Sequence, residues 1–309
     1  MKHLLIGGYG AHLTTIDDSL GVVAAKPAHH ASFLAAHPTL PVVYSVAEND
    51  RGMVAAYRVE DGRLSELDAR SSEGDSPCHV AVHPSGEVLA VANYGDGTAS
   101  LHRLDASGAF TGEPVVLRYR GSGPVAGRQE GAHAHQAVFD GDLLYITDLG
   151  TDEVRRYDLR GEFLGAFALA PGSGPRHMVV AGDTWYVAGE LDGVISLIDH
   201  ATGRTAGVRA SAVEGVNYPS HIELSGDLVY VANRGPNTIS VFRAGDLTPV
   251  AEVPSGGDWP RHFAIDGERL YVANQNSGGL AVLPLKDGLP APAVQVLAVE
   301  TPSCVLPLR

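Results

Sequence analysis

Short runs of apolar residues, many of them β-branched or aromatic, alternate along the whole chain with turns that contain Gly, Asp or Asn. A typical pair of runs covers residues 80–84 and 88–93, with Ser85 and Gly86 in the turn between them. Alternating apolar residues on both sides of such a turn predict an antiparallel β-hairpin. Because the pattern recurs from one end of the chain to the other, we expect an all-β protein.

The same short phrase introduces one hairpin after another, and it places a polar, often basic residue at the start of an apolar strand. Its seven copies cover residues 31–33, 77–79, 134–136, 175–177, 219–221, 260–262 and 302–304. Repeats of about 40–45 residues built from short strands are typical of β-propeller blades. We predict a seven-bladed β-propeller with four-stranded blades. A length of 309 residues alone would suggest two domains, but the unbroken repeat predicts one domain over residues 1–309.

The two ends of the chain complement each other. The seventh phrase is followed by only a few residues before Arg309, whereas residues 4–9 and 12–16 have the patterns of a second and a third strand. We therefore predict that residues 3–9 pair beside residues 303–307 in one blade. The N- and C-terminal strands then close the ring and remove the exposed sheet edges of an open fan.

The repeat also predicts where a site would lie. In an antiparallel hairpin, the start of the first strand and the end of the second lie at the same sheet edge. Seven radial hairpins would gather these residues at one mouth of the central channel. Arg176, Arg234 and Arg261 come from successive blades, and Glu190 lies among them. Each Arg could pair with a neighbouring carboxylate, but three guanidinium groups at one mouth favour an anionic small molecule.

The histidines fall into two groups. Most copies of the phrase end in His, which indicates a structural role in hydrogen bonding between blades; these are His79, His177, His221 and His262. Of these, His177 is also a candidate for substrate binding. The third copy breaks the pattern, because Gln136 ends it and His133 and His135 come just before. Since functional sites arise where symmetry is broken, this departure favours a functional role for both histidines.

Glu190 is a second departure from the repeat, because the neighbouring blades carry Arg234 and Gln275 at the corresponding place. A carboxylate near Arg176 and Arg234 could hold an arginine, activate a water molecule or ligate a cation. A hard cation could in principle be held by a ring of oxygen-bearing residues, namely Glu48, Asn93, Asp148, Asn233 and Asn274. Because arginines and histidines share the same mouth, we expect no metal and no cofactor there.

Composition narrows the partners and the compartment. The formal net charge of −14 disfavours nucleic acids and anionic membranes as partners. Two cysteines, Cys78 and Cys304, argue against a disulfide framework and for a reducing cytoplasm. The first residues lack the apolar run of a signal peptide, and no run is long enough to span a membrane. We expect a cytoplasmic protein that is a monomer or a weak homodimer.

Several motifs together resemble those of a known family, the seven-bladed propeller lactonases, which includes propeller-type 6-phosphogluconolactonases and fungal carboxy-muconate lactonizing enzymes. They lie at residues 77–84, 131–136, 174–177, 232–234 and 259–263. The resemblance covers the whole chain. It implies a metal-independent site in which a His, a Glu and arginines act on an anionic lactone. Matched residue by residue, it implies His135, Arg176, Glu190 and a later arginine, either Arg234 or Arg261.

These observations predict a lactonase that hydrolyses a sugar-acid lactone, with 6-phosphogluconolactone as a candidate substrate. We expect His135 or Glu190 to act as general base and Arg176 to stabilise the oxyanion. Arg234 and Arg261 would hold the carboxylate or phosphate, and His133 and His177 would contribute to substrate binding. Two alternatives remain open, a muconate-type lactonizing cycloisomerase and a non-catalytic ligand-binding or scaffolding propeller.

Overall fold

The second strand of each hairpin is apolar and buried on both faces, which explains its nearly continuous hydrophobic sequence. In the computed structural model, which describes residues 3–308, every residue of β9 (Val88–Asn93) and β21 (Leu228–Arg234) is buried. Successive side chains of a strand point to opposite faces of its sheet. In β9, Ala90 and Ala92 therefore enter one hydrophobic cluster, whereas Leu89 and Val91 enter another.

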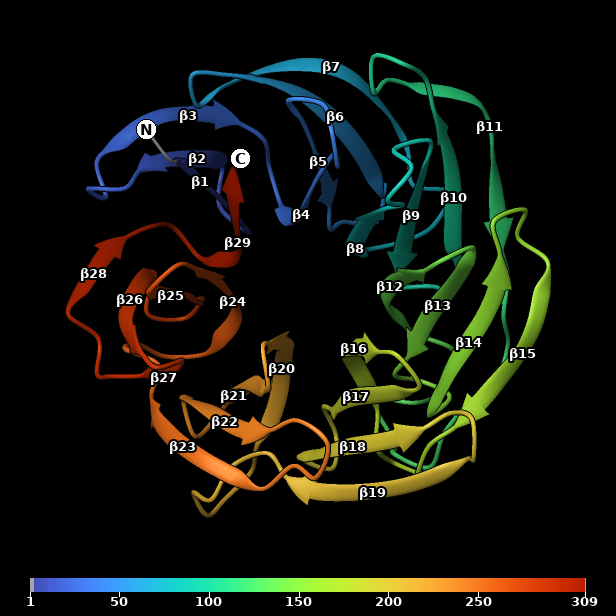
Figure 1. The fold of residues 1–309 in the computed structure, drawn as a ribbon. Coiled ribbons are helices and arrows are strands. Elements are labelled where there is room, and N and C mark those ends of the chain that lie inside the picture. Colours follow the sequence, from blue (N-terminus) through green and yellow to red (C-terminus); the bar gives the residue numbers. More distant parts are fainter. Residues whose placement is uncertain (1–2, 309) are drawn as a thin grey trace. The chain divides into compact units, whose positions relative to one another are not determined.

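The described residues form strands, turns and bends but no helix, and the strands fall into seven sheets, as shown in Figure 1. The chain divides into two compact units, Met1–Pro171 with Leu306–Arg309, and Gly172–Val305. The single domain expected over residues 1–309 stays a prediction, and its residues 1, 2 and 309 lie outside the described part. Among residues 3–308, no helix is long and apolar enough to cross a membrane.

The first unit contains three complete four-stranded sheets, whose strands pair in chain order. They are β4 (Ala31–Ala36), β5 (Val42–Ala47), β6 (Met53–Glu60) and β7 (Arg63–Ser71); β8 (Pro77–Val82), β9, β10 (Ala99–Leu104) and β11 (Phe110–Leu117); and β12 (Ala134–Asp140), β13 (Leu143–Asp148), β14 (Glu153–Asp158) and β15 (Phe163–Ala168). An irregular segment, residues 118–133, lies between β11 and β12.

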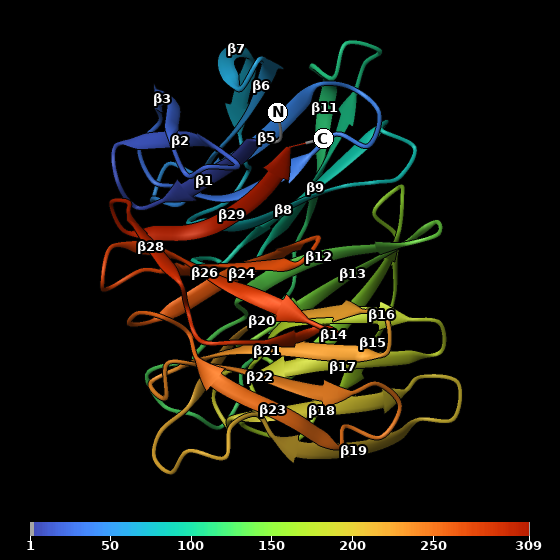
Figure 2. The same cartoon turned by 60° about the vertical axis from the view of Figure 1, so that its left-hand side comes forward.

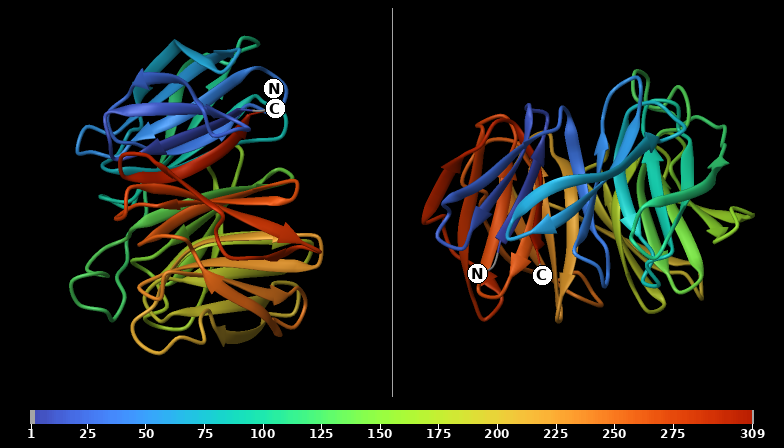
Figure 3. Two further views of the ribbon diagram at one scale, coloured as in Figure 1. Left: turned by 90° about the vertical axis from the view of Figure 1, so that its left-hand side faces the viewer. Right: turned by 90° about the horizontal axis from the view of Figure 1, so that it is seen from above.

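The predicted pairing of the two ends is confirmed. One sheet has the order β29-β1-β2-β3, with β29 (Pro302–Leu308), β1 (His3–Gly8), β2 (His12–Asp17) and β3 (Val22–Pro27). The red C-terminal strand accordingly lies beside the blue N-terminal strands in Figures 1 and 3. The last strand of the chain thus supplies the first position of a sheet whose other three strands begin the chain.

The second unit contains three sheets, which Figure 2 shows from the side. They are β16 (Pro175–Ala181), β17 (Thr184–Gly189), β18 (Val194–Asp199) and β19 (Arg204–Arg209); β20 (Tyr218–Ser225), β21, β22 (Thr238–Arg243) and β23 (Pro249–Pro254); and β24 (Pro260–Asp266), β25 (Arg269–Asn274), β26 (Gly279–Lys286), β27 (Leu289–Pro290) and β28 (Gln295–Ala298). In the last sheet the fourth position is divided, because β27 and β28 both pair with β26.

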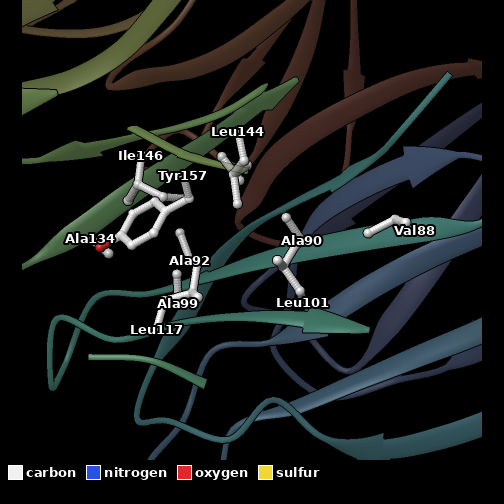
Figure 4. Packing of buried hydrophobic residues seen from close by; sticks show 11 residues of the cluster. Val88, Ala90, Ala92, Ala99, Leu101, Leu117, Ala134, Leu144, Ile146 and Tyr157 are labelled. Atoms are coloured by element: carbon white, nitrogen blue, oxygen red, sulfur yellow. The ribbon is translucent and has the colours of Figure 1, made fainter. Parts of the chain in front are cut away.

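Hydrophobic clusters lie between neighbouring sheets of the same unit. Figure 4 shows one of them, in which Ala90 and Leu101 of one sheet pack near Leu144, Ile146 and Tyr157 of the next. A corresponding cluster in the second unit joins side chains of β21 and β22 to side chains of β24, β25 and β26. Burial of apolar surface between sheets stabilises each unit, at roughly 25 cal/mol per Å² removed from water.

Each hairpin that begins with the phrase and whose register is described has an irregularity at the start of its first strand. The pairing skips the second residue of the phrase, for example between Ala134 and Gln136, between Pro175 and His177, and between Pro260 and His262, and in one hairpin it skips the third residue as well. A β-bulge of this kind leaves one residue outside the ladder and redirects its side chain. The same β-bulge recurs from sheet to sheet. It takes His135, Arg176 and Arg261 out of the regular alternation of side chains along their strands.

Candidate active site

The central feature of the second unit is a buried carboxylate shared by two arginines. Oε2 of Glu190 lies 3.1 Å from Nε of Arg176 and accepts a hydrogen bond from Nη2 of Arg234 at 2.6 Å. All three residues are almost inaccessible, with exposed fractions of 3–5%. Charge-assisted hydrogen bonds of this kind are stronger than neutral ones. The prediction that these residues lie together is thus confirmed for Arg176, Glu190 and Arg234.

Both arginines are also fixed by backbone oxygens. Nη1 of Arg176 donates to the carbonyl of Ser220 at 2.5 Å, and the Ser220 hydroxyl donates to the carbonyl of Pro260 at 2.6 Å. Nε of Arg234 donates to the carbonyl of Tyr218 at 3.0 Å. Three neighbouring sheets are therefore tied together by the residues that hold this cluster. Such preorganised cations can stabilise negative charge that develops on a bound oxygen.

Arg261 occupies a more open position than the other two arginines. It is half-buried, and its Nη1 donates a long hydrogen bond of 3.4 Å to Oε1 of Gln275. This partial exposure suits a role in contacting an anionic group from solution.

The histidines of the repeated phrase make the contacts between sheets that the sequence predicted. The Nδ1 atoms of His177 and His221 lie 2.9 Å apart, so one ring donates and the other accepts. The His221 and His262 rings stack at 4.0 Å. His262 accepts a hydrogen bond from the backbone of Val305 at 3.4 Å. Burial, together with the charge of Arg176, lowers the pKa of His262 to about 3, so this ring is neutral at physiological pH.

The first unit holds the other two predicted histidines beside an aromatic ring. His133 stacks on Tyr94 with ring centroids 4.6 Å apart, and His135 meets the same ring edge-on at 5.4 Å. Nδ1 of His133 donates to the carbonyl of Tyr94 at 2.7 Å. Because a carbonyl can only accept, the neutral His133 ring carries its proton on Nδ1 and leaves Nε2 able to accept one.

His135 is buried and lies next to Cys78, the corresponding residue of the preceding sheet. The Cys78 sulfur is 3.7 Å from Nδ1 of His135, and its thiol donates to the His135 carbonyl at 3.2 Å. The arrangement fixes the strand start that carries His135. His133 and His135 belong to the first unit, whereas Arg176, His177, Glu190, Arg234 and Arg261 belong to the second.

Most of the residues considered in principle for a hard cation make other polar contacts within their own unit. The amides of the closing asparagines bond to the segment that follows the last strand of the preceding sheet: Nδ2 of Asn93, Asn233 and Asn274 donates to the carbonyl of Ser72, Ala210 and Ser255, respectively. Asp148 is fully buried and its Oδ2 lies 3.1 Å from Nη2 of Arg155. Within residues 3–308, no group of three or more His, Cys, Asp or Glu side chains is arranged to hold a metal ion.

Three aromatic residues near these groups were not identified from the sequence. Trp259 and Tyr218 adjoin Arg234, and Tyr94 adjoins His133 and His135. A positional signal was present, because Tyr218 and Trp259 immediately precede their copies of the phrase, as His133 does. The position immediately before the phrase therefore contributes side chains both to the arginine cluster and to the pair of histidines.

Comparison with known proteins shows to which family the chain belongs. A family model described as "Lactonase, 7-bladed beta-propeller" matches residues 11–307. A 6-phosphogluconolactonase of Formosa agariphila is 32% identical over 235 residues, which are 69% of this chain and 67% of that protein. A 6-phosphogluconolactonase of Bacillus subtilis is 29% identical over 249 residues, covering 73% of this chain and 71% of the relative.

A solved structure agrees over nearly the full length. The periplasmic gluconolactonase of Pseudomonas aeruginosa superimposes with a TM-score of 0.88 at 26% identity, and the match covers 100% of this chain and 99% of that one. The predicted fold class and the resemblance noted in the sequence are both confirmed. Because the match includes all but the ends of the chain, this protein belongs to the lactonase family of seven-bladed β-propellers.

Proposed function

We propose that this protein is a lactonase that hydrolyses the lactone of a sugar acid, with 6-phosphogluconolactone as the first substrate to test. The observation that carries the proposal is the buried Glu190 carboxylate, which fixes Arg176 and Arg234 side by side. Two relatives are named 6-phosphogluconolactonase, and a structural neighbour is named gluconolactonase. An anionic lactone is the substrate class that suits both this family and an arginine-rich site.

In lactone hydrolysis, water adds to the carbonyl carbon, the carbonyl oxygen becomes an oxyanion, and the bond to the ring oxygen then breaks. The ring oxygen takes up a proton, and the product is the open-chain acid. Arg176 is held by Glu190 and the Ser220 carbonyl, and we assign it to the oxyanion. The half-buried Arg261 is the better candidate for the carboxylate or phosphate, because Arg234 is occupied by Glu190 and the Tyr218 carbonyl.

The general base has two candidates from the sequence, His135 and Glu190. Oε2 of Glu190 accepts a hydrogen bond from Arg234 and forms an ion pair with Arg176, so this carboxylate is better placed to orient the two arginines than to take a proton from water. We therefore retain His135 as the proposed base and treat Glu190 as a positioning residue. His135→Gln should lower kcat by about 10²–10⁴ and remove the acidic limb of the pH–rate profile, whereas Glu190→Gln should keep that limb.

The decisive measurement is hydrolysis of glucono-δ-lactone and its 6-phosphate above the spontaneous background, in excess EDTA. We expect wild-type activity to survive chelation, and Arg176→Lys to lose about 10²-fold in kcat because the planar fork of the guanidinium is lost. The matched control is Arg243→Lys, an exposed arginine of β22, which should keep full activity. A wild-type protein that binds these lactones tightly without hydrolysing them would instead be a binding propeller, and isomerised product would indicate a cycloisomerase.

The cytoplasmic location and the monomeric or weakly dimeric state also stay proposals. The chain has two cysteines, Cys78 and Cys304, both buried, and so low a cysteine content supports a reducing compartment. Cell fractionation and light scattering of the purified chain would test the two statements separately.

A further inference from the structure

Trp259 adopts a backbone conformation that bulky residues rarely take. It directly precedes Pro260 at the start of β24, and its φ angle is +66°. The residues before four other copies of the phrase also have positive φ, namely His30, Ser76, Gly174 and Thr301. The left-handed turn is therefore part of the repeat, and Trp259 places the largest of these side chains in it. A retained outlier of this kind indicates a local function.

Two hydrogen bonds fix the backbone of Trp259 in this conformation. Its N–H donates to Oδ1 of Asn237 at 2.9 Å, and its carbonyl accepts from the N–H of Gln275 at 3.0 Å. Asn237 is itself held by a hydrogen bond of 2.7 Å from its Nδ2 to Oδ1 of Asp258. The indole is therefore presented from a rigid turn.

The indole extends the arginine cluster with an aromatic surface. The Arg234 guanidinium lies over the Trp259 ring at 5.4 Å from its centroid, and the Tyr218 ring is 6.0 Å away at an interplanar angle of 52°. Trp259 and Tyr218 are each half-buried, so part of each ring remains accessible. Glu190 and the Tyr218 carbonyl hold Arg234 in place beneath this surface. A flat apolar face thus adjoins a fixed cation.

We propose that Trp259, with Tyr218 beside it, is a specificity-determining platform that stacks against the C–H face of a closed sugar-lactone ring. The inference rests on the proposed lactonase function and names the feature of the substrate that this part of the site recognises. A six-membered sugar ring presents several C–H groups on one face, which pack on an aromatic ring. The open-chain acid formed by hydrolysis has no such face. Trp259 therefore favours the ring-closed substrate over the product.

Fluorescence tests the contact independently of activity. The chain has two tryptophans, and Trp185→Phe leaves Trp259 as the single indole. The probes are D-glucono-δ-lactam, a ring-closed analogue that resists hydrolysis, and D-gluconate, the open-chain acid. We expect the lactam to shift or quench the Trp259 emission saturably and gluconate to bind at least tenfold more weakly. An unchanged spectrum at lactam concentrations that inhibit hydrolysis would overturn the proposal.

Kinetics distinguish a platform from a residue that merely supports Arg234. Trp259→Phe keeps a ring and should raise KM less than threefold. Trp259→Gly removes the ring but suits the left-handed backbone, so KM should rise about five- to tenfold while kcat and melting temperature change little. A fall in kcat with unchanged KM would mean that Trp259 only positions Arg234. If the wild type hydrolyses no lactone but the lactam still shifts the Trp259 emission, the platform stands and the proposed hydrolysis fails.

Discussion

Glu223 is a single residue whose ionisation makes the stability of this fold depend on pH. It lies on β20 two residues after His221, and its Oε2 is 3.9 Å from Nε2 of that ring. Burial raises the pKa of Glu223 from 4.5 to about 7. The folded state therefore holds this proton more tightly than the unfolded chain does. Its contribution to stability is fully present below pH 4.5 and is lost as the pH rises through about 7.

Glu223→Gln removes this titration while keeping the shape of the side chain. We expect the variant to melt about 2 °C or more above wild type at pH 8, a shift that corresponds to roughly 1 kcal/mol in a chain of this size. At pH 4.5 the two proteins should melt together. Glu113→Gln, on an exposed position of β11, is the control and should show no such pH dependence. A variant less stable than wild type at pH 8 would mean that ionised Glu223 stabilises the fold through His221.

At the same scale, departures from the repeat served as the signal for candidate site residues. Glu190 was found in this way, and it lies in contact with Arg176, one of the arginines that recur in successive blades. For the asparagines that end the second strands, the sequence left a cation-binding role open, because a strand pattern does not say where a terminal amide turns; Asn93 turns back to the Ser72 carbonyl. Trp259 was missed because its unusual φ angle is a property of the backbone, which no pattern of side chains reveals.

Among the elements, the turn between β13 and β14 depends on a buried ion pair. Oδ1 of Asp148 accepts from the backbone of His133, Gly150 and Thr151 at 2.8–3.1 Å, and Oδ2 faces Arg155. The Arg155 guanidinium also lies over the Tyr119 ring at 4.6 Å. This pair therefore anchors the residue that precedes β12. From the sequence, Asp148 was expected at the mouth of the central channel. The sequence does not show that Arg155 points inward from the next strand.

Arg155→Met leaves the Asp148 charge buried without its partner. We expect the free energy of unfolding to fall by about 3–5 kcal/mol, as for other buried pairs that lose one member. Adding Asp148→Asn should recover part of this loss, because the neutral amide oxygen can still accept from the backbone. Arg156→Met, at an exposed position of the same strand, is the matched control and should be nearly neutral. Urea denaturation measures all four proteins, and an Arg155→Met variant as stable as wild type would contradict the argument.

For the whole molecule, the sheet that combines both ends of the chain was predicted from the phrase at residues 302–304 and the strands that begin the chain. The number of sheets followed from the same repeat. The divided outer position of the last sheet could not be predicted, because β27 has only two residues and β28 only four. Such short strands depend on their pairing with β26 and carry little pattern of their own.

Deleting residues 1–10 tests this closing sheet. The deletion removes β1 with its buried side chains Leu4, Leu5 and Ile6, and it leaves β29 and β2 without the strand between them. Two unpaired sheet edges favour aggregation, and the lost burial lowers stability. We expect insoluble protein, or a melting temperature at least 10 °C below that of wild type. Deleting residues 1–2 keeps β1 and is the control. A chain without residues 1–10 that stays soluble and melts like wild type would show that β1 is not needed to close the fold.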